Sequence, residues 1–331
     1  MGGPAGPGAL RQLVPHRRLE HEVKTALIGY TGFVGSNIAA AQDFTDCYNT
    51  SNISDIRGRS YDLVVSAAAR ADSHRINQNG AADLAEIDNY IALLSDVNAA
   101  QLVLVSTVCI YPGGTSPDES TPLSADGLTP YGANRLHMEQ TLCERFNTLT
   151  LRLPQLYGAG LKKGIVYDLL NDYRIEFIRP EGRFQYYDLR RLWSDTEMAL
   201  QAGLQTLNIA TPPLPNARVA AECFGIDIAD QVVAGEESAF AQMYTRDMRT
   251  IHADLFGGPP GYILDEVAEL DALRAFVRES RQPAGSTRTG LGGARNEPRR
   301  REFTECISPT QFPPSSPAPG AGCGLEATSY W

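Results

Sequence analysis

The fold is decided by the stretch Val23-Lys24-Thr25-Ala26-Leu27-Ile28-Gly29-Tyr30-Thr31-Gly32-Phe33-Val34-Gly35, which precedes a helix-like segment at 37–41. This order of apolar strand, glycine turn and helix is typical of a site for a dinucleotide pyrophosphate. The first glycine permits a tight turn, the second lets phosphates approach the backbone, and the third lets the helix pack on the strand. The helix N-terminus then offers unpaired N–H groups to the anion. The same spacing also occurs in ordinary strand–helix turns, so the rest of the chain must decide.

The composition is that of an ordinary globular protein. The chain has 331 residues, of which 43% are hydrophobic and 21% charged, enough for one large or two modest domains. Its formal net charge of -10 argues against a nucleic-acid partner. The sequence has no run of eighteen apolar residues, which predicts that no segment spans a membrane. The six cysteines are scattered without metal-ligand spacing, and the N-terminus lacks an apolar signal region. We therefore expect reduced thiols, no metal site and a cytoplasmic location.

The two ends of the chain differ in character from the middle. Residues 1–22 are rich in Gly and Pro and predict a flexible leader. Residues 283–331 are rich in Pro, Gly, Ser and Arg, have little to bury, and predict a disordered tail. The folded part should therefore span 23–282.

Strand-like and helix-like segments alternate between these ends. This alternation predicts a parallel sheet with helices on both faces, which is a doubly wound α/β fold. The expected strands are 46–49, 61–66, 102–107, 149–153 and 206–209, and the expected helices are 81–97, 130 onward, 164–171, 189–202 and 265–279. In the last helix the apolar stripe is Val267, Leu270, Leu273 and Val277.

Two segments suit contact with a cofactor. Small side chains at Ala67, Ala68 and Ala69 follow a buried strand, although alanine is also common in this chain. Asn49 ends the second strand, where a carboxylate would select NAD and an arginine would accommodate a 2′-phosphate. The neutral segment 49–52 does neither, and Arg57 and Arg59 lie further along, so the choice between NAD and NADP stays open.

A long polar loop and a helix follow the strand at 102–107. The loop 111–129 is too long for a simple connection and is expected to shape a substrate cleft. The helix starts near Pro130, a suitable first-turn residue. Tyr131 and Arg135 are four residues apart and should share one face of this helix. The polar loop 70–74 could also face a substrate.

Taken in order, these motifs resemble the extended short-chain dehydrogenase/reductase superfamily, the NAD-dependent epimerases and dehydratases. The resemblance covers roughly residues 23–280 and implies a Rossmann-type doubly wound parallel sheet with a small C-terminal substrate lobe, mainly from 160–282. Its motifs here are Gly-Tyr-Thr-Gly-Phe-Val-Gly at 29–35, Ser-Ala-Ala-Ala at 66–69, Val-Ser-Thr-Val-Cys-Ile-Tyr-Pro at 105–112, Pro-Tyr-Gly-Ala-Asn-Arg at 130–135, Arg-Leu-Pro-Gln-Leu-Tyr-Gly at 152–158, Phe-Gln-Tyr-Tyr-Asp-Leu at 184–189 and Leu-Asn-Ile-Ala at 207–210.

The resemblance assigns roles to residues of the site. Tyr131 becomes the acid/base, Thr107 the hydroxyl partner with Ser106 beside it, and Arg135 occupies the position of the family's lysine. In the family this lysine lowers the tyrosine pKa, ordinarily about 10, and hydrogen-bonds the nicotinamide ribose. The resemblance implies NAD or NADP as cofactor, held by Gly29, Tyr30, Thr31, Gly32, Phe33, Val34, Gly35, Asn49, Ala67, Ala68, Ala69 and Pro154.

Arginine at the lysine position is a departure from the family pattern. Arg135 keeps the positive charge, but its planar fork is larger than an ammonium group. Either it does the lysine's work, or the chemistry is lost and nucleotide binding remains. We expect from the resemblance that Arg135→Lys keeps or raises activity. Dehydratases of the family carry an acidic pair after the hydroxyl residue; here Val108 and Cys109 follow Thr107, which disfavours water elimination.

The expected function is therefore an NAD(P)-dependent oxidoreductase or epimerase acting on a nucleotide sugar or a related hydroxy or keto small molecule. The alternative is a nucleotide-binding sensor or scaffold that no longer reacts. Lys162, Lys163 and Arg183 could contact a diphosphate or could be solvated surface groups. His74 and His137 are not at metal spacing, and His137 is expected to be structural. The resemblance also implies a homodimer.

Overall fold

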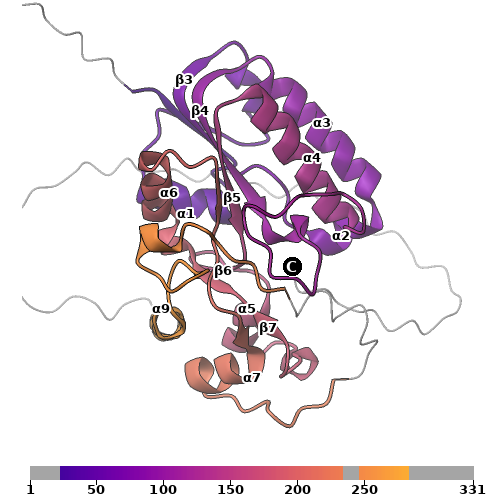
Figure 1. The fold of residues 1–331 in the computed structure, drawn as a ribbon, viewed down its shortest axis with the longest axis vertical. Coiled ribbons are helices and arrows are strands. Elements are labelled where there is room, and N and C mark those ends of the chain that lie inside the picture. Colours follow the sequence, from indigo (N-terminus) through magenta and orange to yellow (C-terminus); the bar gives the residue numbers. More distant parts are fainter. Residues whose placement is uncertain (1–22, 234–245, 283–331) are drawn as a thin grey trace, which may run out of the picture.

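The computed structural model describes residues 23–233 and 246–282. The predicted leader (1–22) and tail (283–331) lie outside these residues. A six-stranded, entirely parallel sheet forms the larger part, with the order β2-β1-β3-β4-β5-β9 (Figure 1). Its strands are β1 (Thr25–Ile28), β2 (Asp46–Tyr48), β3 (Ser60–Ser66), β4 (Asn98–Thr107), β5 (Thr148–Leu153) and β9 (Thr206–Asn208).

Helices cover both faces of this sheet, as the alternation of elements predicts. One face carries α2 (Ser73–Gln78), α3 (Gly80–Leu94) and α4 (Pro130–Arg145), and the other carries α1 (Phe33–Ala41) and α6 (Leu192–Gln201) (Figure 1). Successive strand residues point to opposite faces, so Val64 packs under α3 and α4 while Val65 packs with the α1 and α6 side. Both faces are therefore buried, which explains the nearly continuous apolar strands.

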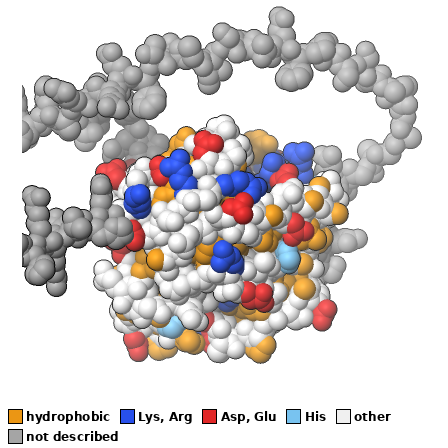
Figure 2. Space-filling view, turned by 90° about the horizontal axis from the view of Figure 1, so that it is seen from above, with side chains coloured by type: hydrophobic (Ala, Val, Ile, Leu, Met, Phe, Trp, Pro, Cys, Tyr) orange, Lys and Arg blue, Asp and Glu red, His pale blue; other side chains and the backbone are white. Residues whose placement is uncertain are grey.

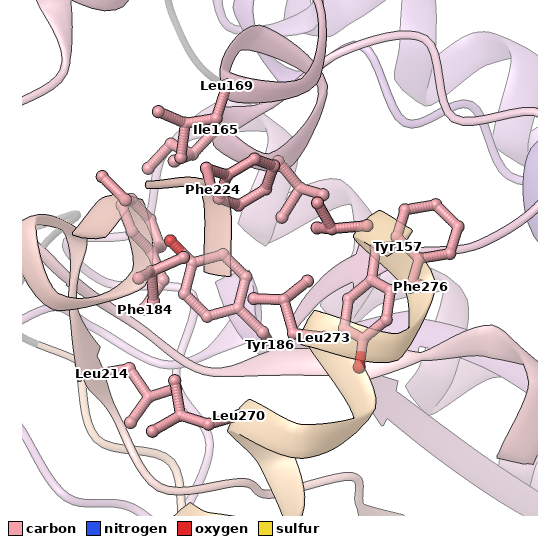
Figure 3. Packing of buried hydrophobic residues seen from close by; sticks show 14 of the residues in the cluster. Tyr157, Ile165, Leu169, Phe184, Tyr186, Leu214, Phe224, Leu270, Leu273 and Phe276 are labelled. Atoms are coloured by element: carbon pink, nitrogen blue, oxygen red, sulfur yellow. The ribbon is translucent and has the colours of Figure 1, made fainter. Parts of the chain in front are cut away.

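A smaller lobe lies against the lower end of the sheet in Figure 1. It consists of two short strand pairs and the helices α5, α7 and α9, around an apolar core of its own. Figure 3 shows Tyr157 and Phe276 meeting in that core, with ring centroids 5.1 Å apart. The elements are β6 (Gln155–Tyr157) with β8 (Tyr186–Asp188), β7 (Arg183–Phe184) with β10 (Leu214–Pro215), α5 (Ile165–Leu170), α7 (Asn216–Val219) and α9 (Glu266–Ser280).

The predicted elements all exist, but several boundaries were wrong. Helix α1 begins at Phe33, directly after the glycine turn, rather than at 37. Strand β4 begins four residues early, at Asn98, because it pairs along the full length of β3. The predicted loop 70–74 runs into α2, whose N-cap Asp72 accepts a hydrogen bond from the backbone N–H of Arg75. In α9, Val267 is 65% exposed and Phe276 is buried instead, because the lobe core ends at Leu270.

Charged groups of both signs are mixed on the surface. Figure 2, which looks onto the molecule from above, shows blue and red side chains interspersed with apolar ones, and no basic patch gathers among the described residues of this face. The absence of a nucleic-acid partner and the cytoplasmic location stay predictions. Within the described ranges, no helix has the length and apolar character needed to cross a bilayer.

Candidate active site

The glycine turn joins β1 to α1, and its three glycines serve different needs. Gly29 has φ +85°, and a Cβ on it would lie closer than 3.0 Å to the Ala67 carbonyl oxygen. A Cβ on Gly35 would overlap the Gly29 carbonyl in the same way. A Cβ on exposed Gly32 would meet only the Gly29 oxygen, at 3.2 Å. Packing within the protein therefore requires the first and third glycines, whereas the second leaves space in front of the turn.

The residues predicted to bind a cofactor gather around this turn. Ala67, Ala68 and Ala69 follow β3, the neighbour of β1, and the Ala67 N–H donates to Ile28 O at 2.9 Å. Thr31 is exposed, whereas Phe33 and Val34 pack partly into the core at the start of α1. Pro154 is buried after β5. The carboxyl ends of parallel strands meet at one edge of the sheet, so these segments lie at the edge where α/β folds bind ligands, and their contact with a cofactor stays a prediction.

Asn49 lies at the end of β2 with its side chain fully engaged. Its Nδ2 donates to the Tyr30 hydroxyl at 3.3 Å, and its Oδ1 accepts from the Ser51 N–H and hydroxyl. Arg57 and Arg59 lie at the amino ends of the strands instead, where Arg57 forms an ion pair with Asp96 and the Arg59 Nε donates to Asp55 O at 3.1 Å. This end of the sheet thus presents a neutral polar turn.

Tyr131 sits in the first turn of α4, where the chain is well capped. The Thr129 hydroxyl accepts from the Gly132 N–H, Pro130 is the first helical residue, and the Tyr131 N–H donates to Asn77 Oδ1 at 2.9 Å. The Tyr131 side chain is only 8% exposed and hydrogen-bonds the Thr107 hydroxyl at the end of β4. The structure therefore brings together the predicted pair of phenol and hydroxyl.

The environment keeps the Tyr131 phenol protonated. Burial raises the pKa of Tyr131 to about 12, and the nearby Cys109 thiol and Asp83 carboxylate act in the same direction. The Arg135 guanidinium and the Thr107 hydroxyl lower this pKa, but by less than burial raises it. Near neutral pH, Tyr131 is thus a proton donor. Neither Cys109 nor Asp83 was among the predicted site residues.

Arg135 does share a face with Tyr131, but its partners were not foreseen. Its side chain is 1% exposed, and its Nη1 and Nη2 donate to the two oxygens of Asp83 on α3 at 2.9 and 3.1 Å. Nη2 also donates to Arg70 O at 2.5 Å, and the guanidinium carbon lies 4.7 Å from the centre of the Tyr131 ring. Asp83 lies on the same stripe of α3 as Ile87 and Leu94. A carboxylate on an apolar stripe was the signal in the sequence that could have revealed the pair.

Ser106 does not join the phenol. Neighbouring strand residues alternate in direction, so its hydroxyl points to the other side of β4 and donates to Glu139. Glu139 forms a buried ion pair with Arg152, whose Nη1 donates to the Tyr111 hydroxyl at 2.6 Å. Ser106 therefore contacts Glu139 in this structure, and its catalytic role beside Thr107 stays a prediction.

The lobe contains a cavity of about 440 Å³ on the side of β7 and β10. Its carboxylates have partners: Asp247 pairs with Arg249, and Glu266 pairs with Arg218. The Arg183 and Arg246 guanidiniums supply the positive charge, and the buried Arg246 Nε has no hydrogen-bond partner within 23–233 and 246–282. The lining consists of Arg183, Pro212, Pro213, Arg246, Asp247, Tyr262 and Glu266.

The loop 111–129 forms a support for this cavity. The Glu119 carboxylate accepts hydrogen bonds from the Asn208 N–H at 2.7 Å, the Thr250 hydroxyl at 2.7 Å and the Ile251 N–H at 2.9 Å. The Asp247 N–H donates to Thr115 O at 3.1 Å. The loop thereby fixes the segment that carries Arg246 and Asp247.

The other predicted charges lie away from the cavity. Lys163 donates to Ala71 O at 2.6 Å and so links the lobe to the loop after β3, and Lys162 is exposed. His137 Nε2 lies within hydrogen-bond distance of Asp88 Oδ1, at 2.8 Å, on the exposed side of α3 and α4, and its structural role stays a prediction. No group of His, Cys, Asp and Glu suited to a metal ion occurs in the described part of the chain.

Comparison with known proteins is consistent with the motifs. Residues 40–175 match the sequence model of the NAD dependent epimerase/dehydratase family, a match that begins after the glycine turn. No curated protein sequence matches. Among solved structures, MoeE5 in complex with UDP-glucuronic acid and NAD has a TM-score of 0.60 at 14% identity, covering 78% of this chain and 99% of its own.

Two further structures cover 78% of this chain with the same TM-score of 0.60. One is DesIV, a dTDP-glucose 4,6-dehydratase from Streptomyces venezuelae, as a double mutant with NAD bound, at 15% identity and 98% of its own chain. The other is UDP-glucose 4-epimerase with UDP-glucose from Thermotoga maritima, at 14% identity and 100% of its own chain. At these identities the likeness shows a shared fold. The motifs, the match over residues 40–175 and the shared fold make this chain similar to the NAD dependent epimerase/dehydratase family.

Proposed function

We propose that this protein is an NAD-dependent oxidoreductase or epimerase that acts on a nucleotide sugar or a related hydroxy or keto compound. The observation that carries the proposal is the buried pair of Tyr131 and Thr107 at the sheet edge where the glycine turn opens. A phenol held by a hydroxyl, next to a crevice at the carboxyl ends of parallel strands, can exchange a proton with a substrate oxygen.

The residues present fit a dinucleotide. Gly32 is exposed and its missing side chain leaves room in front of the turn, which is what close approach of a pyrophosphate requires. The buried Arg135 Nε, which has no partner in the described structure, is a donor available to a ribose hydroxyl. Arg57 and Arg59 contact Asp96 and Asp46 at the amino ends of β4 and β2, away from Asn49 at the carboxyl end of β2. Neither of these two guanidiniums is therefore placed for a 2′-phosphate, which favours NAD over NADP. MoeE5 and DesIV were crystallised with NAD.

Tyr131 and Thr107 have different roles in the proposed reaction. NAD supplies the acceptor or donor of a hydride. Tyr131 carries a proton near neutral pH and donates it to a carbonyl oxygen, while the Thr107 hydroxyl holds the phenol in place. Burial of Tyr131 keeps water away from this proton transfer. The protonated phenol therefore favours reduction of a ketone over oxidation of an alcohol.

The cavity in the lobe suits an anionic substrate. Arg183 and Arg246 offer guanidinium groups, which bind phosphate oxygens in two-point geometry, while the lining carboxylates are neutralised by Arg218 and Arg249. Structural neighbours were crystallised with UDP-glucose and UDP-glucuronic acid. We propose that the diphosphate of a nucleotide sugar occupies this cavity.

Titration of the full chain with NADH, followed by nicotinamide fluorescence, tests the cofactor. We expect saturable binding, at least tenfold weaker in Gly32→Ala because the new methyl group fills the space in front of the turn. Ser36→Ala, on exposed α1 surface next to the turn, is the matched control and should bind as the wild type does. Absence of binding of both NADH and NADPH at millimolar concentration would refute the proposal.

Calorimetric titration with UDP-glucose tests the substrate class. Arg246→Ala should weaken binding at least tenfold, whereas Arg278→Ala, on the last turn of α9, should leave it unchanged. Equal affinity of the two variants for UDP-glucose would mean that the diphosphate does not bind in this cavity.

One observation favours a second function, a cofactor-binding protein without turnover. Arg135 forms an ion pair with Asp83, so the positive charge of Arg135 stabilises the Tyr131 phenolate less than the charge of an unpaired lysine would. Transfer of deuterium from labelled NADH to a bound keto sugar discriminates between the two functions. Binding without any transfer, in both the wild type and Tyr131→Phe, would favour the second.

A further inference from the structure

We propose that Asp83 is the positioning residue that makes arginine the required cation at position 135. Its carboxylate fixes the guanidinium beside Tyr131, with the Nε–H left as the donor for the ribose of the dinucleotide. This inference rests on the proposed function, and it assigns a role to a residue outside the motifs of the sequence.

The contacts around Asp83 hold the guanidinium in one orientation. Asp83 binds both terminal nitrogens of Arg135, and Asn134 Nδ2 donates to the same carboxylate at 2.9 Å and to Gly80 O at 2.8 Å. Arg70 O accepts a further bond from Arg135. A bidentate pair fixes the plane of the guanidinium as well as its position. Asn134 in turn prevents the carboxylate from rotating.

The remaining donor is the reason to look for a ligand. The Arg135 side chain is only 1% exposed, yet its Nε has no hydrogen-bond partner among the described residues. An unpaired buried donor is costly, about 1–3 kcal/mol. Arg70, whose carbonyl accepts a hydrogen bond from Arg135, belongs to the loop that continues from Ala67–Ala69, so the guanidinium contacts the loop that is expected to meet the cofactor.

Lysine cannot take over this arrangement by itself. An ammonium group is a point charge and cannot bind both oxygens of Asp83 in a fixed plane. Because a buried carboxylate demands a partner, Asp83 would draw the ammonium of a lysine toward α3 and away from the crevice. Restoring the family lysine therefore requires a change at Asp83 as well. This reverses the expectation from the sequence that Arg135→Lys keeps or raises activity.

A single and a double variant of the full chain test the inference, with NADH as the probe and nicotinamide fluorescence as the readout. Arg135→Lys should weaken NADH binding at least tenfold, and Asp83→Asn combined with Arg135→Lys should return it to within threefold of the wild type. Asp88→Asn is the matched control, since Asp88 also links α3 to α4 through His137 but is exposed. It should change neither NADH affinity nor the midpoint of thermal unfolding.

A second variant, with apolar residues at positions 83 and 135, tests the inference in case the first variants fail to fold. Asp83→Leu with Arg135→Met removes both charges, and such replacements of buried ion pairs often preserve stability. This variant should unfold near the wild-type temperature while binding NADH at least tenfold more weakly, because it lacks the Nε–H donor. Wild-type NADH affinity in this folded variant would mean that the Arg135 Nε–H does not bind the dinucleotide, which would overturn the inference.

The outcomes separate the two proposals. Wild-type affinity in Arg135→Lys, or no recovery in the Asp83→Asn/Arg135→Lys variant, overturns the role of Asp83 while the wild type still binds NADH. Failure of the wild type itself to bind NADH overturns the proposed function, and the inference with it.

Discussion

Helix α4 contributes to two buried arginine–carboxylate pairs that look alike and differ in one respect. Arg152 pairs with Glu139 and lies 5.3 Å from the centre of the Tyr111 ring, while Arg135 pairs with Asp83 and lies 4.7 Å from the centre of the Tyr131 ring. Each ion pair thus consists of a buried guanidinium and a buried carboxylate, and a tyrosine ring lies beside it.

The first pair is closed and the second is open. Around Arg152, Glu139 also accepts from Ser106, and the Tyr111 hydroxyl donates to Asp118 O at 3.0 Å. Around Arg135, the Nε has no partner in the described ranges. A closed buried network fixes a structure, because every polar group is satisfied. The network around Arg135 still has one donor, the Nε–H, that a ligand can use. We take this difference to distinguish the candidate site from the structural scaffold.

The largest expected effect concerns the open pair. Tyr131→Phe removes the proton donor and should lower turnover about a thousandfold, or about 4 kcal/mol, because general acid catalysis is lost. NADH affinity and the thermal midpoint should stay close to the wild type. Steady-state rates with a keto nucleotide sugar measure the effect. Turnover within tenfold of the wild type would place the proton donor elsewhere.

The closed pair should respond in stability and not in binding. Glu139→Leu leaves Arg152 buried without its carboxylate and should lower the free energy of unfolding by about 3 kcal/mol. Urea unfolding measures this change, and NADH titration of the folded variant should give an affinity within about threefold of the wild type. A specific loss of NADH affinity would contradict the division into scaffold and site.

The pH dependence sharpens the role of Tyr131. Because the pKa of Tyr131 is raised to about 12, the phenol stays protonated from pH 6 to 8, and kcat/KM for ketone reduction should be flat there. Alcohol oxidation needs the phenolate and should rise about tenfold per pH unit over the same range. Initial rates in both directions test this. A plateau in the oxidation profile below pH 8 would mean that the pKa of Tyr131 is lowered from its ordinary value and not raised.

The smallest expected effect concerns a buried carboxyl group of the lobe. Glu269 accepts from the Tyr186 N–H at 2.8 Å, but its Oε2 has no hydrogen-bond partner in the described part of the protein. Burial raises the pKa of Glu269 well above the usual 4.5, so the protonated form is favoured on folding and stability is lost as the pH rises above that value. Glu269→Gln should therefore gain about 1 kcal/mol over the wild type between pH 5 and 7. Thermal unfolding at both pH values measures it, and an equal difference at the two would rule out titration as the cause.

The sequence predicted the doubly wound sheet because the signals for it are local. Glycine spacing, apolar strands and amphipathic helices each depend on neighbouring residues, so β1, α1 and α4 lie where the sequence predicted them, within a few residues. Boundaries such as the start of β4 at Asn98 depend on the length of the partner strand, which no local pattern contains. The direction of the Ser106 hydroxyl follows from β4 alternation only once its register is known.

The sequence by itself determined the family of folds, the glycine turn and the placing of Tyr131 with Thr107. Only the tertiary structure decided which groups Arg135 contacts, because its partner Asp83 lies 52 residues earlier on another helix. It also decided that Gly32 faces open space while Gly29 and Gly35 are required by packing, and that Arg246 lines the cavity with Arg183. The physical reason is the same in each case. Hydrogen bonds and ion pairs between distant segments depend on distances of a few ångströms, and these exist only after the helices have packed on the sheet.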